Sequence, residues 1–357
     1  MTRPSVSGGA RIIVLVVATF AITACGDASD PSGAPVASAS ATTASTAQSS
    51  ATPTVSPDAP GGLPATDLAL ARIESIASPC EMAEGLGLVW VTSYARSEVV
   101  ALDPLTNEVV RSYSVPEGPC GVSVGFDAVW VSGGTQTVAR IDPETGDVLA
   151  TISIPGEIYD VQVGLDAVWA TDRTNGSLVR IDPATNEIAA SYDVGTSADG
   201  FRIAEDAIWV AADRSNEVVR VDPVDGSIVA EIAVGNRPNW VAVGDDAIWV
   251  ENTRDSTVSR IDPATNEVVG TYEVGRGPVY LAVHSGRVWV ANGLARSVSV
   301  LDAASGDPIA QIAFETGVHG LASAASSIWV LDLHGPRISD NLKGTTMWRL
   351  DPAGVDR

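Results

Sequence analysis

Residues 206–235 decide the fold, and they read DAIWVAADRSNEVVRVDPVDGSIVAEIAVG. This stretch holds three short apolar runs separated by polar turns, with a tryptophan in the first run and an Asp-Pro pair beginning thirteen residues later. Versions of it recur along the chain. The equivalent tryptophans are Trp90, Trp130, Trp169, Trp209, Trp249, Trp289 and Trp329, with spacings of 40, 39, 40, 40, 40 and 40 residues. A period of about forty residues in strand-rich units is typical of propeller blades.

The aspartate that usually precedes proline recurs with the same period and predicts a turn. The equivalent residues are Asp103, Asp142, Asp182, Asp222, Asp262, Asp302 and Asp351. Proline at the second turn position fixes φ, and aspartate at the first position accepts hydrogen bonds from N–H groups of its own turn. We therefore interpret these aspartates as turn formers and not as catalytic acids. The tryptophans lie among branched apolar residues, so we expect them in the core.

Each unit divides into four strands, which we name a to d in chain order. One example has strand a at 241–243, strand b at 248–250, strand c at 258–261 and strand d at 268–274. The last unit has no strand d, whereas residues 70–76 precede the first unit without strands a to c of their own. The sequence thus predicts an all-β, seven-bladed β-propeller of four-stranded antiparallel blades, closed by an N-terminal strand that completes the last blade.

An arginine stands two residues before the turn aspartate in five units, and we interpret it as structural. These residues are Arg140, Arg180, Arg220, Arg260 and Arg349. We expect them to pair across strands with acidic groups such as Glu187 or Glu267.

The N-terminus predicts export and lipidation. Arg3 and Arg11 form a basic region, and the apolar run that follows is too short to span a membrane. The sequence ITAC that ends at Cys25 resembles a bacterial lipobox, which implies cleavage before that cysteine and its acylation. The alternative is an ordinary secretory signal with a chance cysteine. We expect a lipid-anchored protein in the cell membrane, facing the extracytoplasmic side.

Three segments follow from this organisation. Residues 1–24 are the predicted signal peptide, 25–66 the lipidated cysteine with a disordered Ala/Ser/Thr/Pro tether, and 67–357 the propeller. The chain of 357 residues carries a formal net charge of −23. Binding to nucleic acid depends on clustered lysine and arginine, so this balance argues against a nucleic-acid partner.

The repeat resembles the YVTN-type, YncE-like propellers through its W-V-x-x strand, its R-I-D-P-A-T-N-E-V hairpin and its V-G ending. Its x-x-[VI]-W-V pattern is also similar to the streptogramin-lyase-like (virginiamycin B lyase-like) propellers. The resemblance covers about residues 68–357. These motifs specify how a blade is built, so the resemblance implies a fold and not an activity.

The lyase resemblance implies a histidine base supported by a carboxylate and a metal ion. His319, within V-H-G-L, resembles that family's Pro-His-Gly-Ile, but no second histidine joins it. Glu251 is the nearest analogue of the family's strand-b glutamate and is offset by one place. His284 and His334 lie elsewhere in the repeat. We therefore expect no metal, no cofactor and no catalytic residues, and we lean against an enzyme.

The residues that lead into strand a vary from unit to unit, unlike the turns at the opposite end of the strands. In propellers the d-to-a and b-to-c connections share one face, so these residues surround the mouth of the central channel. Arg202 stands in a column of otherwise small or polar residues, with Asp160 and Asp199 as plausible partners. The candidate ligand-binding residues are Tyr159, Asp160, Asp199, Arg202, Asn239, Trp240, Tyr280 and His319. The alternative is a channel mouth filled by a structural ion pair, water and aromatic lids.

Two further sets of residues belong to this face. The b-to-c loops carry Arg96, Arg173, Arg214, Arg254, Arg296 and Arg337, which are either solvated loop charges or a collar favouring an anionic partner. Cys80 and Cys120 occupy equivalent positions in successive units, and outside the membrane we expect them to form a disulfide. The alternative is two free, buried thiols.

These observations favour a membrane-anchored, extracytoplasmic binding scaffold. We expect a monomer that recognises a protein, peptide or glycan of the cell envelope through its d-a and b-c loop face and the channel mouth. One alternative is a propeller enzyme, a lyase or hydrolase, acting around His319. Another is an envelope-assembly or sensor component that uses its blade edges.

Overall fold

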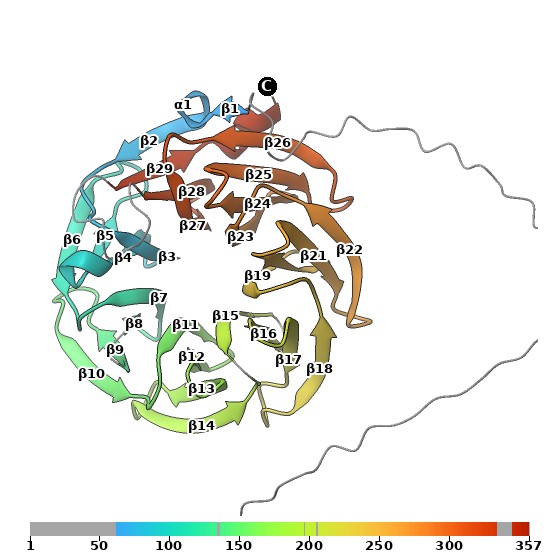
Figure 1. The fold of residues 1–357 in the computed structure, drawn as a ribbon. Coiled ribbons are helices and arrows are strands. Elements are labelled where there is room, and N and C mark those ends of the chain that lie inside the picture. Colours follow the sequence, from blue (N-terminus) through green and yellow to red (C-terminus); the bar gives the residue numbers. More distant parts are fainter. Residues whose placement is uncertain (1–61, 134–135, 196, 205, 334–344, 357) are drawn as a thin grey trace, which may run out of the picture. The chain divides into compact units, whose positions relative to one another are not determined.

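The computed structural model describes residues 62–356, apart from 134–135, 196, 205 and 334–344. These residues form seven antiparallel blades around a common axis, with strand a innermost in each blade (Figure 1). The fold class predicted from the forty-residue period is confirmed. Cys25, His334 and Arg337 lie outside the described residues.

The strands of the first four blades follow each other in chain order from the axis outwards. The first blade holds β3 (Pro79–Gly85), β4 (Leu88–Ser93), β5 (Glu98–Leu102) and β6 (Val109–Ser114), with the short 3-10 helix η1 (Tyr94–Arg96) after β4. The second holds β7 (Pro119–Gly125), β8 (Ala128–Gly133), β9 (Thr137–Ile141) and β10 (Val148–Ser153). The third holds β11 (Ile158–Gly164), β12 (Ala167–Asp172), β13 (Ser177–Asp182) and β14 (Glu187–Asp193). The fourth holds β15 (Ala198–Ile203), β16 (Ile208–Ala212), β17 (Glu217–Val221) and β18 (Ile228–Ala233).

The remaining blades repeat this order until the last. The fifth holds β19 (Pro238–Val243), β20 (Ile248–Asn252), β21 (Thr257–Asp262) and β22 (Glu267–Glu273). The sixth holds β23 (Pro278–His284), β24 (Arg287–Asn292), β25 (Ser297–Asp302) and β26 (Pro308–Ala313). The seventh holds β27 (Gly317–Ala324), β28 (Ser327–Leu333) and β29 (Thr346–Leu350), followed by the 3-10 helix η3 (Pro352–Asp356).

The N-terminal segment closes the ring. Strand β2 (Ala69–Ile73) pairs antiparallel with β29 and is the outermost strand of the seventh blade, as predicted. The structure adds one feature, because β1 (Leu63–Pro64) pairs in parallel with β26 of the sixth blade. The one-turn helix α1 (Ala65–Leu68) connects the two strands. The segment therefore ties two neighbouring blades together. Among the described residues, no helix is long and apolar enough to cross a membrane.

The repeat residues make the contacts that their chemistry predicts. All seven tryptophans are fully buried, and each is expected to contribute up to ~3 kcal/mol by burial. In all seven turns the aspartate Oδ1 accepts the N–H two residues later, at 2.7–3.0 Å. These backbone hydrogen bonds lower the pKa of Asp142 and Asp302. Their role as turn formers is confirmed.

Pairing of the strand-c arginines with acidic groups is confirmed for two of them, since Arg220 Nη2 lies 3.2 Å from Asp206 Oδ2 and Arg260 Nη2 lies 3.0 Å from Asp246 Oδ2, but the glutamates named as partners are wrong. Bulges in the c–d pairing place Arg180 and Arg260 opposite Ala190 and Gly270 and not opposite a glutamate.

Three of the five arginines, Arg140, Arg220 and Arg349, reach the turn of the next blade. The guanidinium of Arg140 donates to the Pro183 carbonyl oxygen at 2.7 Å and lies over the ring of Trp130. Arg349 of the last blade donates in the same way to Pro104 of the first blade, so the contact also runs across the ring closure.

Candidate functional site

Every strand a carries a β-bulge at the variable residues that lead into it. In the third blade Ile158 pairs with Asp172 and Val161 with Ala170, so that Tyr159 and Asp160 together face a single residue of strand b. The register shifts at the corresponding place in the other six blades. A bulge redirects side chains and is common beside functional sites. The residues that vary are thus the residues that the bulges displace.

In three blades the side chain opposite the bulge, Thr92, Thr171 or Glu251, binds the bulge backbone. Thr171 Oγ1 accepts the N–H of Asp160 at 3.2 Å and donates to the carbonyl oxygen of Asp199 in the next blade at 2.8 Å. In the fifth blade this position is Glu251, whose Oε2 accepts the N–H of Trp240 at 2.8 Å. The seven residues of this column are Thr92, Ser132, Thr171, Ala211, Glu251, Ala291 and Leu331. Comparing this column within the chain would have identified Glu251 as an exception.

Arg202 forms a buried ion pair with Asp160. Its Nη1 lies 3.1 Å from Asp160 Oδ2, which also accepts the Phe201 N–H and the Gln162 amide, each at 3.3 Å. Asp160 is fully buried, and its Oδ1 has no hydrogen-bond partner. Of the two partners expected for Arg202, this one is confirmed.

The other expected partner, Asp199, is bound by a different arginine. Its Oδ1 lies 2.7 Å from Nε of Arg173, which comes from the b-to-c loop of the neighbouring blade. Pairing with Arg202 is therefore wrong, because a closer guanidinium reaches Asp199 from the loop face. Burial raises the Asp199 pKa to about 7, although Arg173 opposes that shift.

Four of the predicted residues form a continuous stack. The Arg202 guanidinium lies 4.3 Å from the ring centre of Trp240, and Trp240 lies 4.2 Å from Tyr280. His319 follows, 6.2 Å from Tyr280. Gly200 makes room for this arrangement, since a Cβ there would lie 2.3 Å from the Trp240 ring. Residues from strand a of four successive blades are thus brought together, and all of them except Arg202 lie at the bulges.

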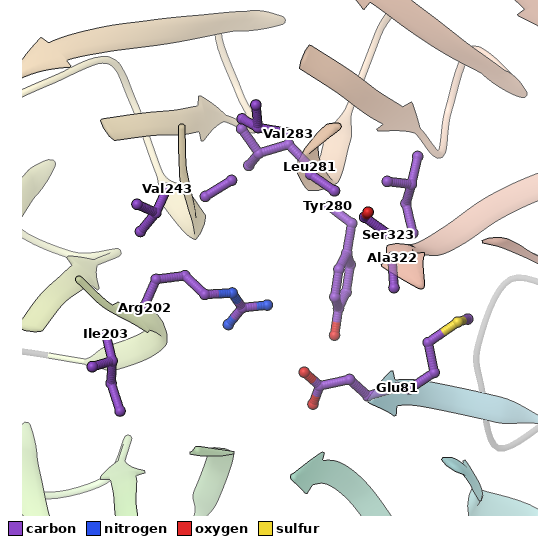
Figure 2. A pocket seen from close by; sticks show the side chains of 13 residues that line it. Glu81, Arg202, Ile203, Val243, Tyr280, Leu281, Val283, Ala322 and Ser323 are labelled. Carbon is purple, nitrogen blue, oxygen red and sulfur yellow. The ribbon is translucent and has the colours of Figure 1, made fainter. Parts of the chain in front are cut away.

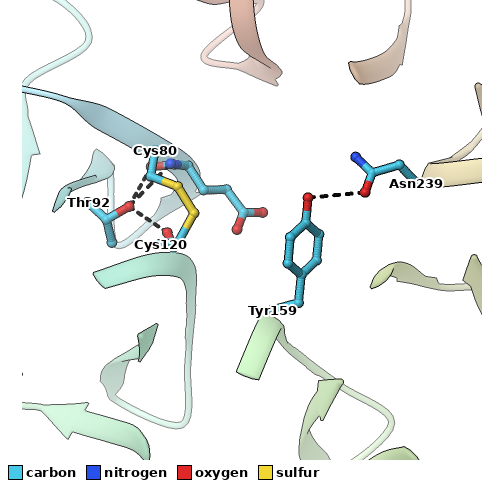
Figure 3. The surroundings of a disulfide bond; sticks show 6 residues. Cys80, Thr92, Cys120, Tyr159 and Asn239 are labelled. Carbon is cyan, nitrogen blue, oxygen red and sulfur yellow. Dashed lines mark hydrogen bonds between the residues drawn. A yellow bond between two sulfur atoms is a disulfide. The ribbon is translucent and has the colours of Figure 1, made fainter. Parts of the chain in front are cut away.

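The remaining pair lies beside the stack. The Tyr159 hydroxyl donates to Asn239 Oδ1 at 3.2 Å, which joins the third blade to the fifth (Figure 3). Tyr159 also meets Trp240 edge-on, with ring centres 6.3 Å apart. Seven of the eight predicted residues are therefore linked by contacts, while Asp199 belongs to the neighbouring Arg173 pair.

A cavity of about 280 Å³ lies against this stack, and we call it the channel site. Its wall is formed by Glu81, Met82, Arg202, Ile203, Ala242, Val243, Tyr280, Leu281, Ala282, Val283, Leu321, Ala322 and Ser323. Figure 2 shows Arg202, Tyr280 and Glu81 pointing toward one another across it. Glu81 was not among the predicted ligand-binding residues. It is the second bulge residue of the first blade, so the same positional rule locates it.

The carboxyl groups around the channel site resist ionisation. Burial raises the pKa of Glu81 well above its ordinary value, and the nearby charge of Asp160 raises it further. Burial likewise raises the Asp160 pKa, although Arg202 favours its ionised form. The Glu251 pKa is raised by burial despite the hydrogen bond from Trp240. The Arg202 guanidinium thus acts on both Glu81 and Asp160, and a donor group entering the cavity would favour their ionisation.

His319 is held in its neutral form. Burial lowers its pKa to about 4, so the ring is uncharged at neutral pH. Among the described residues, no three His, Cys, Asp or Glu side chains group as ligands for a metal ion. Within the part of the chain that the structure describes, there is thus no ligand set for the metal ion that the resemblance to streptogramin-type lyases implies.

A disulfide joins Cys80 and Cys120, whose Cα atoms lie 5.0 Å apart (Figure 3). Thr92 also connects the first two blades by hydrogen bonds. Its Oγ1 accepts the Glu81 N–H at 3.2 Å and donates to the Cys120 carbonyl oxygen at 2.5 Å. The covalent link therefore fixes the strand-a ends of the first two blades next to Glu81.

The fold and site define a seven-bladed β-propeller with a polar and aromatic cavity at its axis. No family model and no curated protein matches the sequence. A solved structure described as a streptogramin B lyase is similar, with a TM-score of 0.66 at 17% identity over 78% of this chain and 97% of that chain. Similarity at this identity shows the fold alone.

Proposed function

We propose that this protein is a membrane-anchored, extracytoplasmic binding scaffold whose channel site holds a group of a peptide or glycan in the cell envelope. The d-to-a and b-to-c connections carry the variable residues, and a rigid scaffold with variable loops is the usual arrangement for binding. The cavity of about 280 Å³ is near the lower end of the range for ligand pockets. It suits a side chain or a single sugar, presented by a larger partner.

The observation that carries this proposal is the excess of buried carboxyl groups over cations. Glu81 and Asp160 approach one guanidinium, that of Arg202, and Asp160 Oδ1 has no donor. Buried acids without partners are costly, so a ligand that supplies an ammonium group or several N–H donors gains most. The ring of Tyr280, which lines the cavity, also favours a cation. The expected ligand group is therefore an amine, as on a lysine side chain or an amino sugar.

Calorimetry with paired probes tests this ligand class. Trilysine is compared with its side-chain-acetylated form, and the glucosamine trimer with the N-acetylglucosamine trimer, because acetylation removes the positive charge and two N–H donors while adding an acetyl group. We expect the amine forms to bind at least about tenfold more tightly. Glu81→Gln should remove that preference, and the matched change Glu108→Gln, on the opposite face, should not. Equal binding of acetylated and free amines would overturn the ligand class.

The membrane anchor is tested separately. Lipidation at Cys25 would hold the protein in the membrane fraction, so Cys25→Ser should release the full chain into the soluble fraction. Retention of the variant in the membrane would contradict a lipid anchor, whatever the probes bind.

An enzyme is the second candidate function, and His319 is the observation that favours it. Its imidazole is unprotonated at neutral pH and so available to accept a proton, although a pKa of about 4 makes it a weak base. Since the described residues do not fit a metal, a lyase of the streptogramin type would need a different arrangement. Streptogramin B turnover by the purified protein that is lost in His319→Ala would support an enzyme, and absence of turnover would remove that lyase reading.

A further inference from the structure

A second cavity of about 420 Å³ lies on the loop face, and we call it the arginine pocket. Its wall consists of Arg173, Asp213, Arg214, Asn216, Asn236, Arg237 and Arg254. Tyr159 connects it to the stack beside the channel site, because the Arg173 guanidinium lies 5.2 Å from the ring centre of Tyr159, which meets Trp240 edge-on. Four guanidinium groups and one carboxylate, that of Asp213, therefore line this pocket, and a second carboxylate, that of Asp199, lies against Arg173, in a protein whose formal net charge is −23.

The arginines come from separate loops and are partly held in place. Asp213 lies 3.6 Å from Arg173 Nη2 and 3.3 Å from Arg237 Nε, so one carboxylate positions two guanidinium groups. No described acidic side chain lies within ion-pair distance of Arg214 or Arg254. The pocket thus combines two fixed cations with two whose charge is not neutralised by an ion pair.

The backbone of Arg237 supplies an independent observation. Its φ is 62°, a left-handed conformation that costs about 1–2 kcal/mol for a residue with a Cβ. The equivalent positions in four other blades also have positive φ, and they hold Ser78, Gly118, Ser197 and Gly277. Here the N–H of Arg237 donates to Asn216 Oδ1 at 2.9 Å, which stabilises the conformation. A long cationic side chain where small residues suffice indicates a role for that side chain.

We propose that the arginine pocket binds the phosphate group of a small molecule or lipid headgroup, as a second site beside the channel site. Guanidinium groups present paired donors that match phosphate oxygens. A phosphate monoester carries up to two negative charges, matching the two cations without ion pairs, and several acceptor oxygens for the other donors. The nearby Asp255 forms no ion pair with these arginines, because its Oδ2 accepts the backbone N–H of Asn236 at 2.6 Å; its charge lowers the positive potential of the pocket without occupying a guanidinium.

Calorimetric titration of the full chain with pyrophosphate and then with phosphate tests the site. We expect saturable binding of one pyrophosphate, stronger than phosphate, which weakens as salt screens the charges. The double change Arg214→Gln and Arg254→Gln should weaken it about tenfold or more, because two charge-assisted contacts are lost. Arg96→Gln with Arg296→Gln is the matched control, since these loop arginines lie outside the pocket.

A third variant separates binding from folding. Arg237→Gly keeps the left-handed backbone and removes the side chain, so the melting temperature should hold or rise while pyrophosphate binding falls. The proposal is overturned if wild type shows no saturable binding, or if the control pair weakens binding as much as the pocket pair. Loss of stability without loss of binding in Arg237→Gly would also count against it.

Vesicles distinguish the two phosphate sources. Full chain carrying Cys25→Ser, which lacks any acyl chain, is mixed with phosphatidylglycerol vesicles or with glycerol 3-phosphate. Capture by vesicles that pyrophosphate displaces indicates a lipid headgroup. Binding of glycerol 3-phosphate without vesicle capture indicates a soluble phosphate ester. If pyrophosphate binds but neither the vesicles nor glycerol 3-phosphate do, the site is restricted to small inorganic anions, and the proposal of a phosphate ester is contradicted.

Discussion

The two faces of the propeller come from the same seven repeats, yet only one of them keeps the repeat strictly. On the face of the a-to-b and c-to-d turns, each turn aspartate makes the same backbone contact in every blade. On the loop face the bulge recurs, but the residues that it displaces differ in every blade. The backbone device is shared and the side chains are free to differ, so binding chemistry can vary without altering the scaffold.

The largest effect should come from the scaffold that both faces share. Trp130 is fully buried in the second blade and Arg140 stacks on it, so Trp130→Ala leaves a large cavity. We expect a loss of about 3–5 kcal/mol in the free energy of unfolding, measured in urea. Probe binding at both sites should persist in the folded fraction, with Trp130→Phe as the milder control. If Trp130→Ala reduced probe binding but hardly changed the free energy of unfolding, the assignment of Trp130 to the scaffold and not to the ligand sites would be contradicted.

The disulfide between Cys80 and Cys120 links the first two blades covalently on the loop face. Replacing both Cys80 and Cys120 with alanine should lower the free energy of unfolding by about 4 kcal/mol, because the bond closes a loop of 40 residues in the unfolded chain. It should also weaken amine binding, since Glu81 follows Cys80 directly. Thiol titration of the unreduced, unfolded protein should find neither cysteine free. Two reactive thiols beyond Cys25 would contradict the bond.

His319 and Asp199 should give opposite dependences of stability on pH. Burial lowers the His319 pKa from 6.5 to about 4, so the folded state binds fewer protons and this contribution is lost as the pH falls through that interval. Burial raises the Asp199 pKa from 3.8 to about 7, so its contribution is lost as the pH rises instead. The measurement is urea unfolding from pH 4 to 7.5.

Single variants separate the two groups. The stability of wild type relative to His319→Asn should fall by up to about 3 kcal/mol on acidification from pH 6.5 to 4. Relative to Asp199→Asn it should fall on going from pH 4 to 7. Parallel pH curves for wild type and both variants would show that neither group titrates as its surroundings require.

Sequence alone predicts what is local and repeated, and misses what two loops create together. The repeated tryptophans and Asp-Pro turns depend on contacts within a single blade. Counting these repeats along the sequence therefore locates every blade, and counting the strands locates the N-terminal strand that closes the ring. The partner of Asp199 depends on a loop from the neighbouring blade, and Arg173 reaches it first. The same holds for Asp213, which joins arginines of two connections. Glu251 was detectable by column comparison, because only in the fifth blade does strand b carry a carboxylate there.

The smallest effect should come from the face of the a-to-b and c-to-d turns. The test asks whether equivalent turns in two blades contribute equally to stability. Residues 182–187 and 262–267 have the identical sequence DPATNE, and Asp182 and Asp262 accept the same N–H at 2.8 and 2.7 Å. Asp182→Ala and Asp262→Ala should each cost about 1 kcal/mol in urea unfolding, since one exposed turn hydrogen bond is lost. Neither should alter amine or pyrophosphate binding. Equal costs at two blades would show that this face is interchangeable, whereas a binding defect from either would mean that the turns, and not only the loops, position the ligand sites.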